Sequence, residues 1–275
     1  ITINNNKNIG IAESLNKGIN YSKGEYIARM DANDIAIKTR FEKQVQYLDN
    51  NDVGLIGTQY KIIDKDANIL RQSIVRYFEP DETISYLAFY NICHATIMLK
   101  REILLGLNYY YSTVLAEDFD LYQRLTSKSK FYVIKEKLMK IRQLSDGLSG
   151  QWNKIEKDID RIRIFQINKI GITPTKEQEL IHSGIVNNHY KKLEKYSISA
   201  IINWFEIVLN ANNEIKFFPN PFFNNQLFIR LLRIFKSRRK NIRDILKYNK
   251  VALLMNKRQT LNDLVSLYMI KNITK

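Results

Sequence analysis

The ten residues from 25 to 34, Glu-Tyr-Ile-Ala-Arg-Met-Asp-Ala-Asn-Asp, constrain the fold of this chain more than any other stretch. Residues 26–30 have the aromatic and branched character of a buried strand. The strand runs directly into the oxygen-bearing side chains of Asp31, Asn33 and Asp34. Ligands of open α/β sheets bind at the carboxyl ends of strands, and oxygen ligands suit a hard divalent cation that also grips phosphates. The alternative is a plain turn, which Asp and Asn also favour.

Other polar motifs flank this strand in a fixed order along the chain. They are Asn8-Ile9-Gly10, Asn16-Lys17-Gly18, Gly24-Glu25-Tyr26-Ile27, Arg40 and Glu117-Asp118. The ordered set resembles the inverting family 2 glycosyltransferases of the GT-A fold, over residues 4 to about 150. The resemblance implies a nucleotide-sugar donor, a divalent metal (Mg²⁺ or Mn²⁺) and a glycan or lipid-linked acceptor. It also implies a place in bacterial surface polysaccharide synthesis.

The resemblance assigns expected roles to the acidic residues. Asp31 and Asn33 would hold the metal on the donor diphosphate. The family usually has Asp where this chain has Asn33, which removes one negative charge, and Asp34 could compensate. Asp118 would be the general base, with Glu117 orienting the loop or meeting the acceptor. The alternative for this pair is structural, because acidic residues at a helix start are favoured by the helix dipole.

Four further polar residues are expected to bind substrate. Asn8 and Asn16 belong to the two upstream Asn-x-Gly motifs of the resemblance. His94 precedes a predicted strand and would contact the donor phosphates or the acceptor, unless it is a structural hydrogen-bonding residue. Arg142 would pair with the diphosphate, although an Arg that ends a strand is commonly a surface ion-pair partner.

Hydrophobic periodicity predicts an α/β domain over residues 1–150, followed by a basic, mainly helical region over residues 151–275. The first is expected to be a GT-A, Rossmann-like mixed sheet with flanking helices. Thr39-Arg40-Phe41-Glu42 reads as a capping box that opens one of these helices. Helices are predicted over 8–21, 40–50, 80–91 and 117–127, and strands over 26–30, 53–63, 69–75, 95–99, 131–134 and 138–143.

Charge divides the chain in the same way. Residues 1–150 hold 20 Lys and Arg against 18 Asp and Glu, whereas residues 151–275 hold 23 against 10, a net charge of +13. Basic and aromatic side chains alternate over residues 222–250, which is typical of a helix lying on an anionic membrane. The alternative is a helix whose apolar side packs on the catalytic domain. Nucleic acid is not expected as a partner, because no recognised nucleic-acid motif accompanies the charge.

The single cysteine, Cys93, excludes an internal disulfide and fits a reducing cytosol. No apolar run is long enough to span a membrane, so we expect a cytoplasmic protein, peripheral on the inner face of the plasma membrane.

The chain opens on Ile1-Thr2-Ile3, which reads as a strand, whereas the family begins with a strand-helix-strand segment. We therefore expect an amino-terminally truncated fragment with an open sheet edge and weak donor binding. The alternative function is an inactive fragment that serves as a membrane- or nucleic-acid-binding module.

Overall fold

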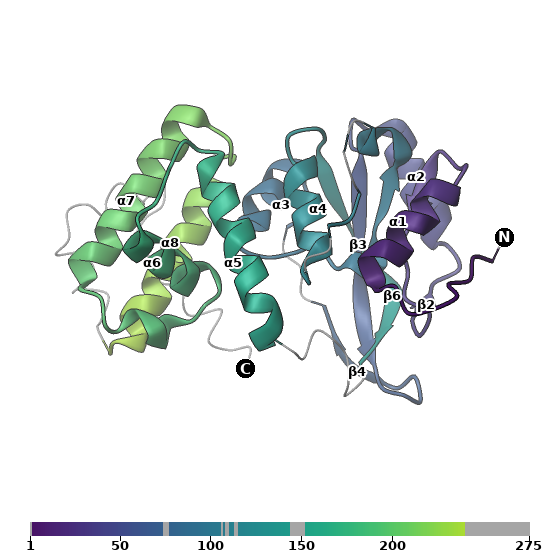
Figure 1. Cartoon of the computed structure of the whole chain (residues 1–275), viewed down its shortest axis with the longest axis horizontal. Helices are drawn as coiled ribbons and strands as arrows, with labels where there is room; N and C mark the ends of the chain where they lie inside the picture. The colour runs from purple at the N-terminus through teal and green to yellow at the C-terminus, as the bar shows by residue number, and fades with distance from the viewer. Residues whose placement is uncertain are drawn as a thin grey trace. The chain divides into compact units, whose positions relative to one another are not determined.

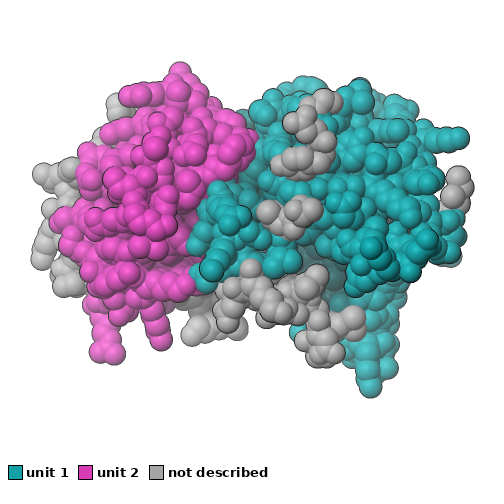
Figure 2. All heavy atoms as spheres, viewed as in Figure 1, with its two compact units in different colours: residues 1–162 teal, residues 163–275 magenta. Residues whose placement is uncertain are grey.

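The computed structural model describes residues 2–73, 77–105, 107, 110–112, 115–143 and 152–239. The chain forms two compact units, residues 1–162 and 163–275, coloured separately in Figure 2. The predicted boundary after residue 150 lies outside the described residues. The division between the units falls within helix α5, Trp152–Asn168.

The described part of the first unit contains a six-stranded mixed sheet (Figure 1). Its path is β1-β5-β3-β6-β2, and β4 pairs with β3 beside this path. The β3–β6 pair is parallel and the other pairs are antiparallel. Among the described strands β1 pairs only with β5. The strands are β1 Tyr26–Ala28, β2 Ile35–Ala36, β3 Leu55–Ile63, β4 Ile69–Gln72, β5 Met98–Lys100 and β6 Phe131–Arg142.

Helices cover both faces of the sheet, because successive strand residues point to opposite sides. Leu55 of β3 packs in a core with residues of α1, α3 and α4. The next residue, Ile56, packs in a second core that contains Leu48 of α2. The helices of this unit are α1 Ile11–Tyr21, α2 Arg40–Asn50, α3 Pro80–Leu87 and α4 Glu117–Leu125, with short 3₁₀ helices η1 His94–Thr96 and η2 Arg101–Leu104.

Four local predictions were wrong. Thr2 and Ile3 lie in no strand, although Ile1-Thr2-Ile3 reads as one. The strand expected over 95–99 begins only at Met98, because the Thr96 side chain bonds the Cys93 carbonyl oxygen at 2.8 Å and favours the turn of η1. The strands expected over 131–134 and 138–143 are one strand, β6, whose pairing with β3 shifts between Ile134 and Lys137. Helix α2 has the predicted bounds, but the Thr39 side chain makes no capping hydrogen bond.

The second unit is helical in its described part. It holds the end of α5, then α6 Lys176–Val186, η4 Tyr190–Leu193, α7 Ile198–Ile215 and α8 Phe222–Ser237. No described helix is long and apolar enough to cross a membrane.

Helix α8 corrects the expectation of an aromatic membrane-facing side. Phe223, Phe228 and Phe235 are buried within the unit, as expected for a packed amphipathic helix. Lys236 and Arg239 remain exposed at its end, and residues 240–250 of the basic segment lie outside the described residues.

Candidate active site

The Asp31–Asp34 segment forms a tight turn after β1. The Asp34 amide donates to the Asp31 carbonyl oxygen at 3.2 Å, and the Asn33 side chain is exposed. The Asp31 carboxylate, whose side chain is 45% exposed, forms a two-pronged ion pair with Arg29. Nη1 lies 2.7 Å from Oδ2 and Nη2 lies 2.6 Å from Oδ1. The predicted metal ligand is therefore reachable, but it is paired with a cation.

Asp34 and Arg142 tie this turn to the end of β6. The Arg142 amide donates to Asp34 Oδ1 at 2.8 Å, and burial raises the pKa of Asp34. The Arg142 side chain donates from Nε to the Asn33 carbonyl oxygen at 3.0 Å and from Nη1 to the carbonyl oxygens of Asp64 and Lys65. Both residues thus hold the turn in place, and the Arg142 guanidinium is engaged with backbone rather than turned toward a ligand.

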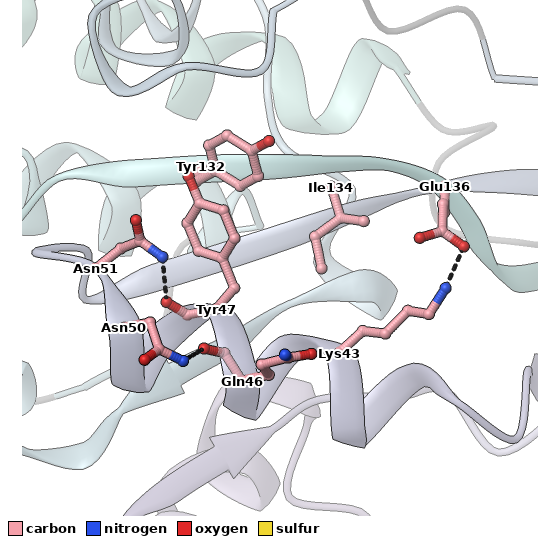
Figure 3. A pocket seen from close by; sticks show the side chains of 8 residues that line it. All are labelled: Lys43, Gln46, Tyr47, Asn50, Asn51, Tyr132, Ile134 and Glu136. Atoms are coloured by element: carbon pink, nitrogen blue, oxygen red, sulfur yellow. Dashed lines mark hydrogen bonds and ion pairs between the residues drawn. The ribbon is translucent and has the colours of Figure 1, made fainter.

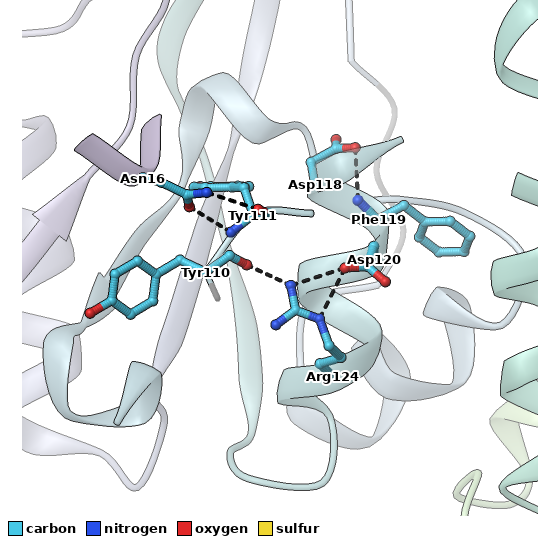
Figure 4. Close-up of polar contacts among 7 residues, drawn as sticks. All are labelled: Asn16, Tyr110, Tyr111, Asp118, Phe119, Asp120 and Arg124. Atoms are coloured by element: carbon cyan, nitrogen blue, oxygen red, sulfur yellow. Dashed lines mark hydrogen bonds and ion pairs between the residues drawn. The ribbon is translucent and has the colours of Figure 1, made fainter. Parts of the chain in front are cut away.

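Glu117 and Asp118 lie together at the start of α4. Asp118 Oδ1 accepts from the Phe119 amide at 2.7 Å (Figure 4). Its Oδ2 accepts from Asn91 Nδ2 at 2.7 Å, so the carboxylate is oriented. Burial raises the pKa of Asp118, and the Phe119 amide, the Arg29 charge and the Asn91 bond oppose the rise. Burial likewise raises the pKa of Glu117 to about 7. The pair thus combines an oriented carboxylate with a group that titrates near neutrality.

Asn16 and His94 brace the loop that precedes this pair. Asn16 Nδ2 donates to the Tyr111 carbonyl oxygen at 2.9 Å, and the Tyr111 amide donates back to Asn16 Oδ1 at 2.8 Å (Figure 4). The Tyr111 hydroxyl lies 2.7 Å from His94 Nε2. Burial lowers the pKa of His94 well below its ordinary range, so the ring is neutral. Arg124, paired with Asp120 of α4, donates to the Tyr110 carbonyl oxygen.

Asn8 shapes the start of α1. Its Oδ1 accepts from the Gly10 amide at 2.9 Å, and Gly10 adopts a φ of 83° that suits glycine. The side chain is exposed and its described bond is local, so Asn8 positions the helix rather than joining the acidic groups.

Arg29 is a site residue that the sequence analysis missed. Its side chain is only 10% exposed, and its charge opposes the raised pKa values of Asp34, Glu117 and Asp118. Arg29 therefore links the Asp31 turn electrostatically to the start of α4. The sequence signal that could have identified Arg29 is a charged residue within a buried strand pattern, because an Arg is rarely buried without a partner.

A groove of about 640 Å³ lies away from these groups, between α2 and β6 (Figure 3). Tyr47 stacks on Tyr132 there, with ring centroids 4.0 Å apart, and Lys43 pairs with Glu136. None of the predicted site residues lines this groove.

Comparison with known proteins supplies the family. Residues 1–105 match the family model described as glycosyl transferase family 2. This part of the chain belongs to that family. The observed mixed sheet with flanking helices and the helical region after it confirm the expected GT-A fold class.

Several relatives share this glycosyltransferase domain. An uncharacterized glycosyltransferase of Methanocaldococcus jannaschii is 35% identical over 145 residues, covering 52% of this chain and 50% of that protein. The O-antigen biosynthesis glycosyltransferase WbnJ of Escherichia coli is 29% identical over 116 residues, covering 42% of this chain and 45% of WbnJ. The chain thus spans about half the length of these relatives. Among solved structures, S. aureus TarS 1-349 in complex with UDP-GlcNAc has a TM-score of 0.49 at 11% identity, covering 83% of this chain and 68% of that one.

Proposed function

We propose that the protein transfers a sugar from a nucleotide-sugar donor to a hydroxyl of a glycan or lipid-linked acceptor, with inversion at the anomeric carbon. The observation that carries the proposal is the link, through the charge of Arg29, between the carboxylate of Asp31 and the oriented carboxylate of Asp118. WbnJ is named for O-antigen biosynthesis, which supports a role in bacterial surface polysaccharide synthesis.

Asp118 is the proposed general base. In a single displacement the acceptor oxygen forms a bond to the anomeric carbon while the bond to the diphosphate breaks, and Asp118 takes the acceptor proton. Asn91 and the Phe119 amide hold both carboxylate oxygens and fix the direction in which the remaining lone pairs point. Burial raises the pKa of Asp118 and makes it a stronger base than an exposed carboxylate. Glu117 shares the same buried start of α4, and its proposed role is to orient the loop or to meet the acceptor.

Asp31 is the proposed protein ligand of a divalent cation, with the exposed Asn33 beside it. The described residues include no group of three His, Cys, Asp or Glu side chains that could hold a metal. A single carboxylate nevertheless fits Mg²⁺ or Mn²⁺ when substrate phosphates supply further ligands, which is the usual arrangement for Mg²⁺. When bound, such a cation neutralises charge on the leaving diphosphate. Asp34 and Arg142 hold the turn that presents Asp31.

A nucleotide-sugar panel tests this proposal. We expect the full-length protein to release nucleoside diphosphate from one donor, to lose that activity in excess EDTA, and to turn over about 10²-fold more slowly as Asp31→Ala. Asp66→Asn, an exposed acid in the turn between β3 and β4, is the matched control and should behave as wild type. Full activity in EDTA would contradict the metal assignment. If no donor yields nucleoside diphosphate, the proposed sugar transfer itself is wrong.

A lipid-linked acceptor would bring the protein to an anionic membrane surface. Because the aromatic side of α8 packs within the second unit, attachment there would be electrostatic, through exposed cations such as Lys236 and Arg239. Each such residue near an anionic leaflet contributes about 1 kcal/mol.

A further inference from the structure

Arg29 occupies both oxygens of the only carboxylate that the proposed function assigns to a metal. The contacts of 2.7 and 2.6 Å are those of a fork-on-fork ion pair, the strongest form of an Arg–carboxylate contact. The Arg29 side chain is 10% exposed and the Asp31 side chain is 45% exposed. A divalent cation that approaches from solvent can reach Asp31, but it has to displace a largely buried guanidinium.

Displacement needs a new anion for Arg29. Separating the pair in the absence of other ligands would place a guanidinium beside a divalent cation, and like charges at short range repel. In the proposed function, the donor diphosphate brings negative oxygens to Asp31. The guanidinium fork matches phosphate as well as carboxylate geometry, and Arg29 Nε is buried with no hydrogen-bond partner among the described residues. That donor is free for a phosphate oxygen.

Hydrogen bonds to both backbone groups of Arg29 hold its main chain independently of its side chain. Arg40, which is fully buried, donates to the Arg29 carbonyl oxygen at 2.8 Å, and the Arg29 amide donates to the Ile97 carbonyl oxygen at 3.0 Å. Rotation of the side chain alone would therefore suffice for Arg29 to exchange partners.

We propose that Arg29 gates cation binding at Asp31: it holds the carboxylate in the donor-free protein and transfers to the donor diphosphate when donor and cation arrive together. This inference rests on the proposed function, because it assigns Asp31 to the cation. It predicts positive coupling between diphosphate and cation, with Arg29 as the residue that carries it.

Two binding measurements test the gate without any sugar transfer. Mn²⁺ alone is titrated by the loss of the free-ion electron paramagnetic resonance signal, and preformed Mn²⁺–pyrophosphate is titrated by calorimetry. We expect Arg29→Gln to bind Mn²⁺ alone about 10-fold more tightly than wild type and Mn²⁺–pyrophosphate about 10-fold more weakly. Arg71→Gln, the same substitution on exposed β4, should leave both affinities unchanged.

Arg29→Lys keeps the charge but loses the fork, and it serves if Arg29→Gln does not fold. It should hold Mn²⁺ affinity within about threefold of wild type while weakening Mn²⁺–pyrophosphate binding. Opposite shifts support the gate, because a purely structural role would weaken both ligands together. Parallel losses, or unchanged Mn²⁺ affinity in Arg29→Gln, would overturn it. If the opposite shifts occur in a protein that transfers no sugar, the gate stands and the proposed function fails.

Discussion

Arg40 connects the stability of the first unit to the geometry of the site. Its buried guanidinium donates from Nη2 to the carbonyl oxygens of Arg29 at 2.8 Å and Ile97 at 3.0 Å, and from Nε to Gln44 Oε1 at 2.9 Å. The side chain thereby joins the end of β1 to the segment before β5. Arg40→Met keeps an unbranched apolar stem and removes all of these donors.

The expected loss of stability follows from the hydrogen bonds that Arg40 donates to these two carbonyl oxygens. A hydrogen bond to a charged group contributes about 1.5–3 kcal/mol, so losing two costs about 3–6 kcal/mol. Burial lowers the pKa of Arg40 to about 10, which shows that the buried charge is itself unfavourable, and removing it returns part of this loss. We expect Arg40→Met to lower the free energy of unfolding by about 2–4 kcal/mol.

Urea unfolding followed by circular dichroism measures this loss. Arg40→Lys is the matched control, because its ammonium group keeps the charge and can still donate to one or both carbonyl oxygens. It should lose about half as much stability. A loss below about 0.5 kcal/mol in Arg40→Met, the range of an ordinary surface substitution, would refute the reasoning.

Three further perturbations are predicted. The pKa of Glu117 is about 7 in the folded protein and 4.5 ordinarily, so wild type loses stability as pH rises between these values. Relative to wild type, Glu117→Gln should therefore raise the free energy of unfolding by about 1–3 kcal/mol at pH 8 and leave it unchanged at pH 4. An equal pH dependence of unfolding in the two proteins would contradict this. Tyr111→Phe leaves buried His94 Nε2 without its partner and should cost about 1–3 kcal/mol in the same urea assay, whereas a neutral result would remove the bond's role. Lys236→Glu with Arg239→Glu should reduce co-sedimentation with anionic vesicles at low salt; equal binding to neutral vesicles would show that charge does not hold the protein there.

The elements that follow one clear periodicity could be predicted from the sequence. Helix α1, Ile11–Tyr21, lies within the predicted range 8–21 because Ile11, Leu15 and Ile19 repeat at helical spacing. The sequence predicts two strands where β6 is continuous, because the polar Lys135 and Glu136 interrupt its apolar pattern. The pairing with β3 shifts register at these residues, and such a bulge is defined only by the partner strand. The sequence of α8 shows an apolar and a basic side but not what covers the apolar side.

The same limit applies to the site. The order of motifs predicted Asp31 directly after a strand and Asp118 at a helix start. In the structure β1 already ends at Ala28, so that Asp31 lies in the turn that follows, whereas Asp118 lies in the first turn of α4. The pairing of Arg29 with Asp31 depends on side-chain direction at the end of β1, which periodicity does not report. Likewise, Asn16 and Tyr111 are far apart in sequence, and only the folded chain brings the amide to the backbone.

The most direct test of the account is the sugar product of the wild-type protein, together with the activity of Asp118→Asn. The anomeric configuration of the transferred sugar is read by nuclear magnetic resonance, and turnover and donor affinity are compared between wild type and Asp118→Asn. The account predicts an inverted product from wild type, and a turnover about 10²–10⁴-fold lower in Asp118→Asn with donor affinity unchanged. A retained configuration, or transfer by Asp118→Asn at nearly the wild-type rate, would contradict it.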